Sequence, residues 1–299
     1  MRRAINEQTV NARRDLRRCQ YDHVQDDGGS CRPWDGEVTA VNPEMNSRED
    51  LSEFRRAFGL WQPRGVVFDC DGLLMDTESL WMLTQRSVSE SHGVLFDAEF
   101  QRKLVGLPAS RIGPLIAGRA GSDPGRVIDQ LLRVNITMVA QSAAPMPGAR
   151  RFVAAASLRV ATAVASNSAR RILDTALLRG DFGAGFDITV SADEVAHPKP
   201  APDVYLAAAD ALDLDPKDCL AIEDSEAGAA SARSAGMKVI AIPTPGQQPW
   251  AHLTRDSLEA SDLLSWVEEW RPTTAPGQSP KAARLTGSTA EPWNPKAAG

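Results

Sequence analysis

Short apolar runs and amphipathic stretches organise the chain, and they alternate regularly from about residue 147 onward. The runs lack polar alternate positions, which is typical of strands buried on both faces of a sheet. The stretches between them have helical spacing and short connections, so the pattern predicts βαβ units around a parallel sheet. The predicted strands are 66–71, 160–165, 186–190, 219–222 and 238–242, and the predicted helices include 149–157, 169–179, 203–212 and 257–270.

A block without strand-like runs separates the first predicted strand from the others. Between residues 78 and 145 the apolar positions recur at steps of three to five residues, which predicts amphipathic helices. Asp123 and Pro124 make a typical helix start. The sequence Pro145-Met-Pro-Gly148 ends the block. We therefore predict a helical insertion soon after the first strand.

The two ends of the chain lack apolar periodicity. Residues 1–60 are polar and mix Arg with Asp and Glu, and the last residues are rich in Pro, Ala, Gly, Ser and Thr. Such composition predicts unstructured segments. The predicted organisation is an extension at 1–60, a first core segment at 61–77, a helical insertion at 78–146, a second core segment at 147–270 and a tail at 271–299.

Composition and charge narrow the class of protein. With 299 residues, of which 42% are hydrophobic, the chain can bury a substantial core. Its formal net charge of -6 argues against nucleic acid or anionic membranes as partners, because both attract clustered positive charge. The four scattered cysteines and the lack of a span-length apolar run predict a cytoplasmic protein with reduced thiols. The sequence leaves the oligomeric state open.

Two aspartates close the first predicted strand. If 66–71 is a strand, Asp69 and Asp71 project from the same side, because side chains alternate between the faces. Two carboxylates in one small volume repel each other, so the pair indicates a nearby cation or a proton-transfer role. The alternative is a solvated turn, since Asp and Gly are common turn residues and Gly72 follows.

Polar residues at the ends of other apolar runs favour a site over a turn. Ser166 and Asn167 follow one run, and Glu223 and Asp224 stand at the end of another. Lys199 lies in the loop beyond a further run. Because the ligand crevice of a parallel sheet lies outside the carboxyl ends of its strands, we expect these side chains to converge with the two aspartates.

The expected cluster has the chemistry of a phosphate-ester site. Carboxylates without a His or Cys ligand favour Mg²⁺, with waters and a phosphate oxygen completing its coordination. Asp69 could attack the phosphorus and form an aspartyl-phosphate. Asp71 could protonate the leaving oxygen and later deprotonate the attacking water. Lys199 and Ser166 would stabilise charge on the phosphoryl oxygens.

Four sequence motifs occur in a fixed order. They are Phe68-Asp-Cys-Asp-Gly-Leu-Leu-Met-Asp-Thr77, Ala165-Ser-Asn-Ser168, Pro198-Lys-Pro-Ala-Pro-Asp203 and Ile222-Glu-Asp-Ser-Glu-Ala-Gly228. In order and spacing they resemble the motifs of the haloacid dehalogenase-like hydrolases, and most closely the β-phosphoglucomutase-like branch. The resemblance extends over roughly residues 64–270. It implies an α/β fold with a Rossmann-like parallel-sheet core and an inserted α-helical cap domain that closes over the core.

The same resemblance implies roles for individual residues. Asp69 would be the nucleophile and Asp71 the acid/base. The implied Mg²⁺ ligands are Asp69, the main-chain carbonyl of Asp71, Glu223 and Asp224. The implied phosphate-binding residues are Ser166, Asn167 and Lys199.

Three further residues are candidates for contacting substrate. Arg111 ends a segment that resembles the family's cap loop near the site, and the alternative is an exposed Arg after a turn. Trp81 stands where β-phosphoglucomutases carry a cap histidine, and the alternative is core packing. His197 neighbours Lys199 and could reach the cap, or it is a surface residue.

Together these features predict a Mg²⁺-dependent phosphatase for a small phosphorylated metabolite such as a sugar or polyol phosphate. Asp71 favours ester chemistry, because relatives that cleave carbon–halogen or carbon–phosphorus bonds are expected to lack the second aspartate. A β-phosphoglucomutase-type mutase is the alternative enzyme, although Trp81 departs from its pattern. The alternative of another class is a catalytically silent phosphate-binding or scaffold protein, which usually lacks a nucleophile or metal ligand.

Overall fold

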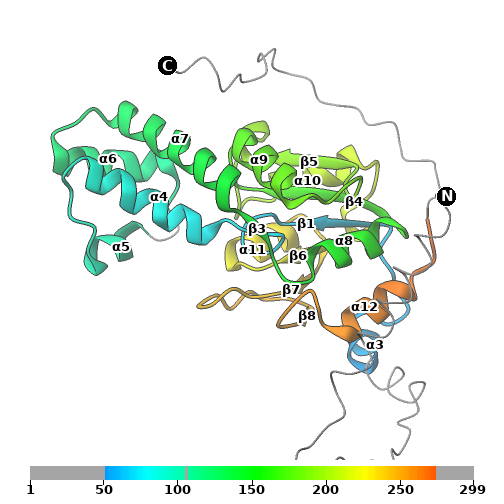
Figure 1. The fold of residues 1–299 in the computed structure, drawn as a ribbon. Helices are drawn as coiled ribbons and strands as arrows, with labels where there is room; N and C mark the ends of the chain where they lie inside the picture. Colours follow the sequence, from blue (N-terminus) through cyan, green and yellow to red (C-terminus); the bar gives the residue numbers. More distant parts are fainter. Residues whose placement is uncertain (1–50, 105–106, 274–299) are drawn as a thin grey trace, which may run out of the picture. The chain divides into compact units, whose positions relative to one another are not determined.

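The core of the molecule is a six-stranded parallel sheet. The computed structural model describes residues 51–104 and 107–273. The strands of the sheet are β1 (Gly65–Phe68), β4 (Ala161–Ser166), β5 (Ile188–Ser191), β6 (Cys219–Glu223), β7 (Lys238–Ala241) and β8 (Leu253–Thr254). Their order is β5-β4-β1-β6-β7-β8, and each neighbouring pair is parallel (Figure 1). The predicted parallel sheet is therefore confirmed.

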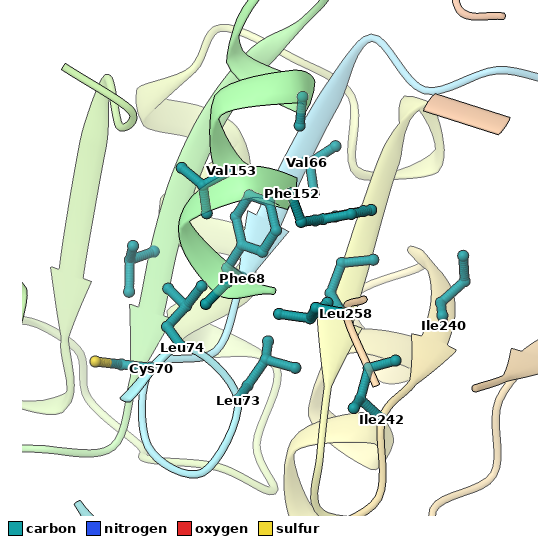
Figure 2. Close-up of a cluster of buried hydrophobic side chains, with 14 of the residues drawn as sticks. Val66, Phe68, Cys70, Leu73, Leu74, Phe152, Val153, Ile240, Ile242 and Leu258 are labelled. Atoms are coloured by element: carbon teal, nitrogen blue, oxygen red, sulfur yellow. The ribbon is translucent and has the colours of Figure 1, made fainter. Parts of the chain in front are cut away.

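The apolar runs form central strands because both of their faces are covered. Every residue of β1, β4 and β6 is buried. Side chains alternate along β1, so Val66 and Phe68 join one buried cluster while Val67 joins another. On the first face Phe68 packs edge-on against Phe152, with ring centroids 5.9 Å apart (Figure 2).

Helices supply the side chains that cover each face. The core helices are α8 (Ala149–Ser157), α9 (Arg170–Gly180), α10 (Asp203–Ala211), α11 (Glu226–Ser234) and α12 (Ser261–Glu268), with 3₁₀ turns at Ala192–Glu194 and Pro216–Asp218. Helices α8, α9 and α12 contribute to the cluster around Phe68. Helices α10 and α11 contribute to the cluster around Val67. This layering of helices on both faces is the arrangement that alternating strands and helices predict.

Four helices form the insertion between β1 and β4. They are α4 (Glu78–Ser91), α5 (Ala98–Leu104), α6 (Ala109–Ala120) and α7 (Pro124–Ser142). These helices enclose a hydrophobic cluster of their own that includes Val88, Phe100 and Leu131. The predicted helix start is confirmed, because Asp123 accepts a hydrogen bond from the Arg126 N–H at 2.9 Å. The predicted α/β core with an inserted helical cap is thus confirmed.

The two connections between core and insertion run side by side. β2 (Met75–Asp76) pairs antiparallel with β3 (Ala144–Pro145), and Met75 lies opposite Pro145. A bridge between Asp71 and Met75 links this pair to the loop after β1. The insertion therefore starts and ends at one place, next to the loop that carries the candidate catalytic residues.

An N-terminal helix packs against the last helix of the core. The prediction that residues 1–60 are unstructured is wrong for α3 (Ser52–Phe58). Its Phe54 and Phe58 rings stack on Trp266 of α12, with centroids 4.8 and 5.0 Å away. A helix of one to two turns is too short to give a clear periodic signal, so the spacing of its apolar residues does not predict a helix.

The predicted tail, 271–299, begins within the described part of the chain. Its first residues are hydrogen-bonded to the core, because the Thr273 N–H donates to the Arg159 carbonyl at 2.8 Å. The other predictions for the chain ends concern residues 1–50 and 274–299, which lie outside the described residues. No helix in the described part of the chain has the length and apolar composition needed to cross a membrane. The cytoplasmic location stays a prediction.

Candidate active site

The loop that follows β1 carries the two predicted catalytic aspartates. The strand ends at Phe68 and not at Asp71, so both aspartates lie in the loop and not on one face of a strand. The loop turns at Gly72, whose φ of +82° lies in the left-handed region. A Cβ at Gly72 would lie 2.5 Å from an oxygen of Asp224. Glycine therefore lets the loop approach the carboxylate that follows another strand.

Three buried carboxylates converge beside this loop. One oxygen from each of Asp69, Glu223 and Asp224 lies within 4.8 Å of the others. Asp69 follows β1, Glu223 ends β6 and Asp224 follows it, so the predicted convergence at the carboxyl ends of parallel strands is confirmed. Oxygen ligands without a His or Cys suit Mg²⁺. The donor set of this acidic cluster therefore fits the predicted ion.

The electrostatics of the cluster also fit a cation. Burial raises the pKa of Asp69 well above its ordinary value; Lys199 opposes this and neighbouring carboxylates add to it. Burial and the adjacent Glu223 raise the pKa of Asp224 to about 7, while a hydrogen bond from Thr244 acts in the opposite direction. Raised values of this kind mark carboxylates with too little positive charge around them. A divalent ion would supply that charge.

Lys199 is the cation that the structure places among these carboxylates. Its ammonium donates to Asp69 Oδ1 at 2.5 Å and to Glu223 Oε1 at 2.6 Å, and its side chain is buried. Burial lowers the pKa of Lys199, but the two carboxylates outweigh burial and raise that pKa above its ordinary value. The ammonium therefore stays charged beside the candidate nucleophile.

Both oxygens of Glu223 are engaged by donors. Oε1 accepts from Lys199 and also from the Tyr205 hydroxyl at 2.7 Å. Oε2 accepts from the N–H groups of Asp224 and Ser225 and from the Ser225 hydroxyl, at 3.0 to 3.2 Å. These five hydrogen bonds fix the orientation of the carboxylate.

Asp71 has a separate set of partners, all of them hydroxyl groups. The Thr77 hydroxyl donates to Oδ1 at 2.6 Å. The hydroxyls of Ser166 and Ser168 donate to Oδ2 at 2.8 and 2.9 Å. Ser166, which ends β4, thus lies at the site as predicted, and its hydroxyl contacts the candidate acid/base.

Asn167 holds the main chain of the Lys199 loop. Its side-chain oxygen accepts from the Lys199 N–H at 2.8 Å, and its amide nitrogen donates to the Lys199 carbonyl at 3.2 Å. The structure therefore brings Asn167 to the site, with its amide occupied by the protein's own backbone. Phosphate binding by Asn167 stays a prediction.

The three candidates for substrate contact lie on three different segments, namely α6, α4 and the Lys199 loop. Arg111 is exposed on α6, and Trp81 packs against the hydrophobic cluster of the insertion. His197 is exposed and pairs with Asp203 at 3.0 Å. In residues 51–104 and 107–273 no hydrogen bond or ion pair joins these three side chains to the acidic cluster of Asp69, Glu223 and Asp224. Their contacts with substrate stay predictions.

Sequence reasoning missed five residues that contact the site. Thr77, Ser168 and Ser225 stand inside the recognised motifs, so the motifs themselves were the signal. The Thr244 hydroxyl donates to Asp224 at 3.0 Å. Thr244 follows shortly after β7, and polar residues just beyond the end of a parallel strand are expected at the site, as Ser166 is. Tyr205 gave no signal, because its ring satisfies the apolar spacing of α10.

The chain is similar to several known proteins. The family model described as "Hydrolase: haloacid dehalogenase-like hydrolase" matches residues 63–236. Hexitol phosphatase B from Escherichia coli (strain K12) is 32% identical over 190 residues, which cover 61% of this chain and 85% of that protein. β-Phosphoglucomutase from Bacillus subtilis (strain 168) is 32% identical over 222 residues, which cover 69% of this chain and 95% of that protein. CbbY from Rhodobacter sphaeroides, solved in complex with phosphate, shares the fold with a TM-score of 0.59 at 24% identity, covering 66% of this chain and 95% of that chain.

Proposed function

The chain belongs to the haloacid dehalogenase-like hydrolases, and we propose that it is a Mg²⁺-dependent phosphatase acting on a small phosphorylated metabolite. The position of Asp69 carries this proposal. Its carboxylate accepts from the buried ammonium of Lys199 and belongs to the acidic cluster with Glu223 and Asp224. A carboxylate that belongs to a candidate metal site and also contacts a buried cation is suited to react with a phosphate ester.

In the first half of the proposed reaction Asp69 is the nucleophile. A carboxylate oxygen of Asp69 attacks the phosphorus, and the bond between phosphorus and the ester oxygen breaks. The leaving oxygen takes a proton from Asp71, which stands two positions along the loop. The products of this step are an alcohol and an aspartyl-phosphate.

In the second half Asp71 reverses its role. As a carboxylate it takes a proton from a water molecule, and that water attacks the phosphorus of the aspartyl-phosphate. The bond between phosphorus and Asp69 breaks, which releases inorganic phosphate and restores the carboxylate. The hydroxyls of Thr77, Ser166 and Ser168 orient Asp71 for both transfers.

Mg²⁺ fits the acidic cluster and would be held by Asp69, the main-chain carbonyl of Asp71, Glu223 and Asp224. Among the described residues, one oxygen of Asp69 and one oxygen of Asp224 accept no hydrogen bond. These two oxygens are therefore the ones most available as metal ligands. When bound, the ion offsets the negative charge of the phosphate group and of the carboxylates around it. Lys199 and Ser166 would bind the phosphoryl oxygens beside it.

The proposed substrate class is a sugar or polyol phosphate. Support comes from hexitol phosphatase B, which matches this chain over 85% of its own length. The leaving group would be selected by Arg111 and Trp81 of the helical insertion and by His197 of the core, the three candidates for substrate contact. A panel of phosphate esters compared by kcat/KM would identify the preferred leaving group directly.

The test of the proposed function is the release of phosphate from p-nitrophenyl phosphate. The protein is expected to need Mg²⁺ for turnover, and Asp69→Asn is expected to abolish it, because a neutral amide cannot form the aspartyl-phosphate. A matched control is Asp76→Asn, which also removes one carboxylate but at an exposed position of β2. Turnover retained by Asp69→Asn, or equal loss in both variants, would count against the mechanism.

A phosphomutase is the second candidate, because β-phosphoglucomutase from Bacillus subtilis matches this chain over 95% of its own length. A mutase would transfer the phosphoryl group between two hydroxyls of a sugar without net release of phosphate. Conversion of β-glucose 1-phosphate to glucose 6-phosphate with little free phosphate would favour it. Stoichiometric phosphate release would favour the phosphatase.

A further inference from the structure

We propose that Tyr205 is a positioning residue for phosphoryl transfer, because its hydroxyl holds Glu223 so that the Lys199 ammonium stays in reach of Asp69. The inference rests on the proposed phosphatase function and adds a residue to its machinery. Tyr205 lies outside the four motifs and presents its polar end to the site from the helix that follows the Lys199 loop.

The ring and the hydroxyl of Tyr205 lie in different surroundings. The residue is fully buried, and its ring belongs to the hydrophobic cluster around Val67. The hydroxyl lies at the edge facing the site and donates to Glu223 Oε1 at 2.7 Å. The Lys199 ammonium lies 3.4 Å from the same hydroxyl and 4.9 Å from the ring centroid. Tyr205, Glu223 and Lys199 therefore form one contact network.

Glu223 Oε1 is shared by two donors, and this sharing sets the strength of its attraction for Lys199. The hydroxyl of Tyr205 takes up part of the negative charge on that oxygen. The other oxygen is held by three donors, so the carboxylate cannot rotate to compensate for a lost partner. Without the hydroxyl, the ammonium would interact more strongly with Glu223 and less with Asp69 and an incoming phosphoryl group.

A simpler role for Tyr205 predicts a different outcome. A buried tyrosine hydroxyl usually finds a hydrogen-bond partner whatever its function, and such a bond stabilises the fold alone. Its loss would then lower the melting temperature and leave catalysis unchanged. A positioning role predicts a lower kcat and weaker phosphate binding in protein that is still folded.

The test compares Tyr205→Phe with Thr162→Val, two variants that each remove one buried hydroxyl. Thr162 lies in β4, and its hydroxyl donates to the Gly185 carbonyl at 2.5 Å. With p-nitrophenyl phosphate, Tyr205→Phe is expected to lower kcat about tenfold, the size of effect expected for one hydrogen bond. Titration calorimetry with inorganic phosphate and Mg²⁺ should show a matching loss of affinity. Thr162→Val should change neither kcat nor phosphate affinity.

The inference also predicts non-additivity. In a Glu223→Gln background the charged acceptor is absent, so Tyr205→Phe should cause no further loss of phosphate affinity. A loss as large as in the parent protein would overturn the inference, and so would a Tyr205→Phe variant with parental kcat and phosphate affinity. If the parent protein itself shows no Mg²⁺-dependent turnover, the proposed function fails, which is a separate result.

Discussion

The Thr77 hydroxyl donates to Asp71 Oδ1 at 2.6 Å. Thr77 is also the residue that precedes α4, the first helix of the insertion. The hydrogen bond therefore links the start of the helical cap to the candidate acid/base. A shift of the chain between Asp71 and α4 would therefore change the hydrogen bonding of the Asp71 carboxylate.

Thr77→Val should reduce catalysis while the fold stays intact. Valine has the shape of threonine but lacks the hydroxyl, so Asp71 would keep the two serine donors and lose the third. We expect kcat/KM for a sugar phosphate to fall by about three- to tenfold, the usual effect of one hydrogen bond. Thr77→Ser, which restores a hydroxyl, should recover most of the activity. Equal activity in Thr77→Val and the parent would contradict this role.

Gly72→Ala should weaken metal activation. A Cβ at Gly72 would lie 2.5 Å from an oxygen of Asp224, so the loop and this carboxylate must shift relative to each other. The Mg²⁺ concentration for half-maximal activity is expected to rise at least tenfold, as is usual when a group that supports a metal ligand is disturbed (roughly 10- to 100-fold). Gly121→Ala is the control, because Gly121 also has positive φ (+65°) but has no atom within 4 Å of such a Cβ. A similar change of Mg²⁺ dependence in both variants would assign the effect to backbone strain alone.

Stability should depend on pH through His252. Burial and the nearby Lys238 lower the pKa of His252 from 6.5, and its Nδ1 accepts from the Val239 N–H at 3.0 Å. The His252 imidazole therefore takes up a proton more readily in the unfolded chain than in the folded protein. The stability contributed by neutral His252 is present above pH 6.5 and is lost as the pH falls below 6.5 toward the lowered folded value. Urea unfolding at several pH values should show a smaller decline in His252→Gln; an identical decline would refute the assignment.

Phe54→Ala should destabilise the protein through the N-terminal helix. Phe54 is fully buried and stacks on Trp266. Truncation of a buried aromatic ring costs about 3 to 5 kcal/mol, measured as the free energy of unfolding in urea. Leu60→Ala is the control, because Leu60 is 101% exposed. Equal stability of the two variants would show that the helix does not contribute to the folded core.

The parts of the site that follow from strand order could be predicted from the sequence. Asp69, Ser166 and Glu223 each end or follow an apolar run, and parallel strands bring such ends together. The direction of Asp71 could not be predicted in this way. The strand stops at Phe68, so the loop, and not the alternation of side chains along a strand, determines where Asp71 points.

Other contacts could not be predicted because they depend on side-chain direction. The hydroxyl of Tyr205 lies at the end of a ring whose spacing indicates only a buried helix face. The short strand β8 and the short helix α3 give too few residues for a period to be recognised. Their apolar residues acquire a partner only in the folded chain, as Phe54 does with Trp266.

The pairing of Met75 with Pro145 gives the helical block the character of an exchangeable cassette. The chain enters and leaves the block across one short ladder, and in the described residues no strand of the large sheet lies between these two crossings. A block from another member of the family, joined at the same two points, would also have to carry a hydroxyl at position 77, because the Thr77 hydroxyl donates to Asp71. Under the proposed role of the insertion, substrate choice would change through replacement of a single contiguous stretch of sequence.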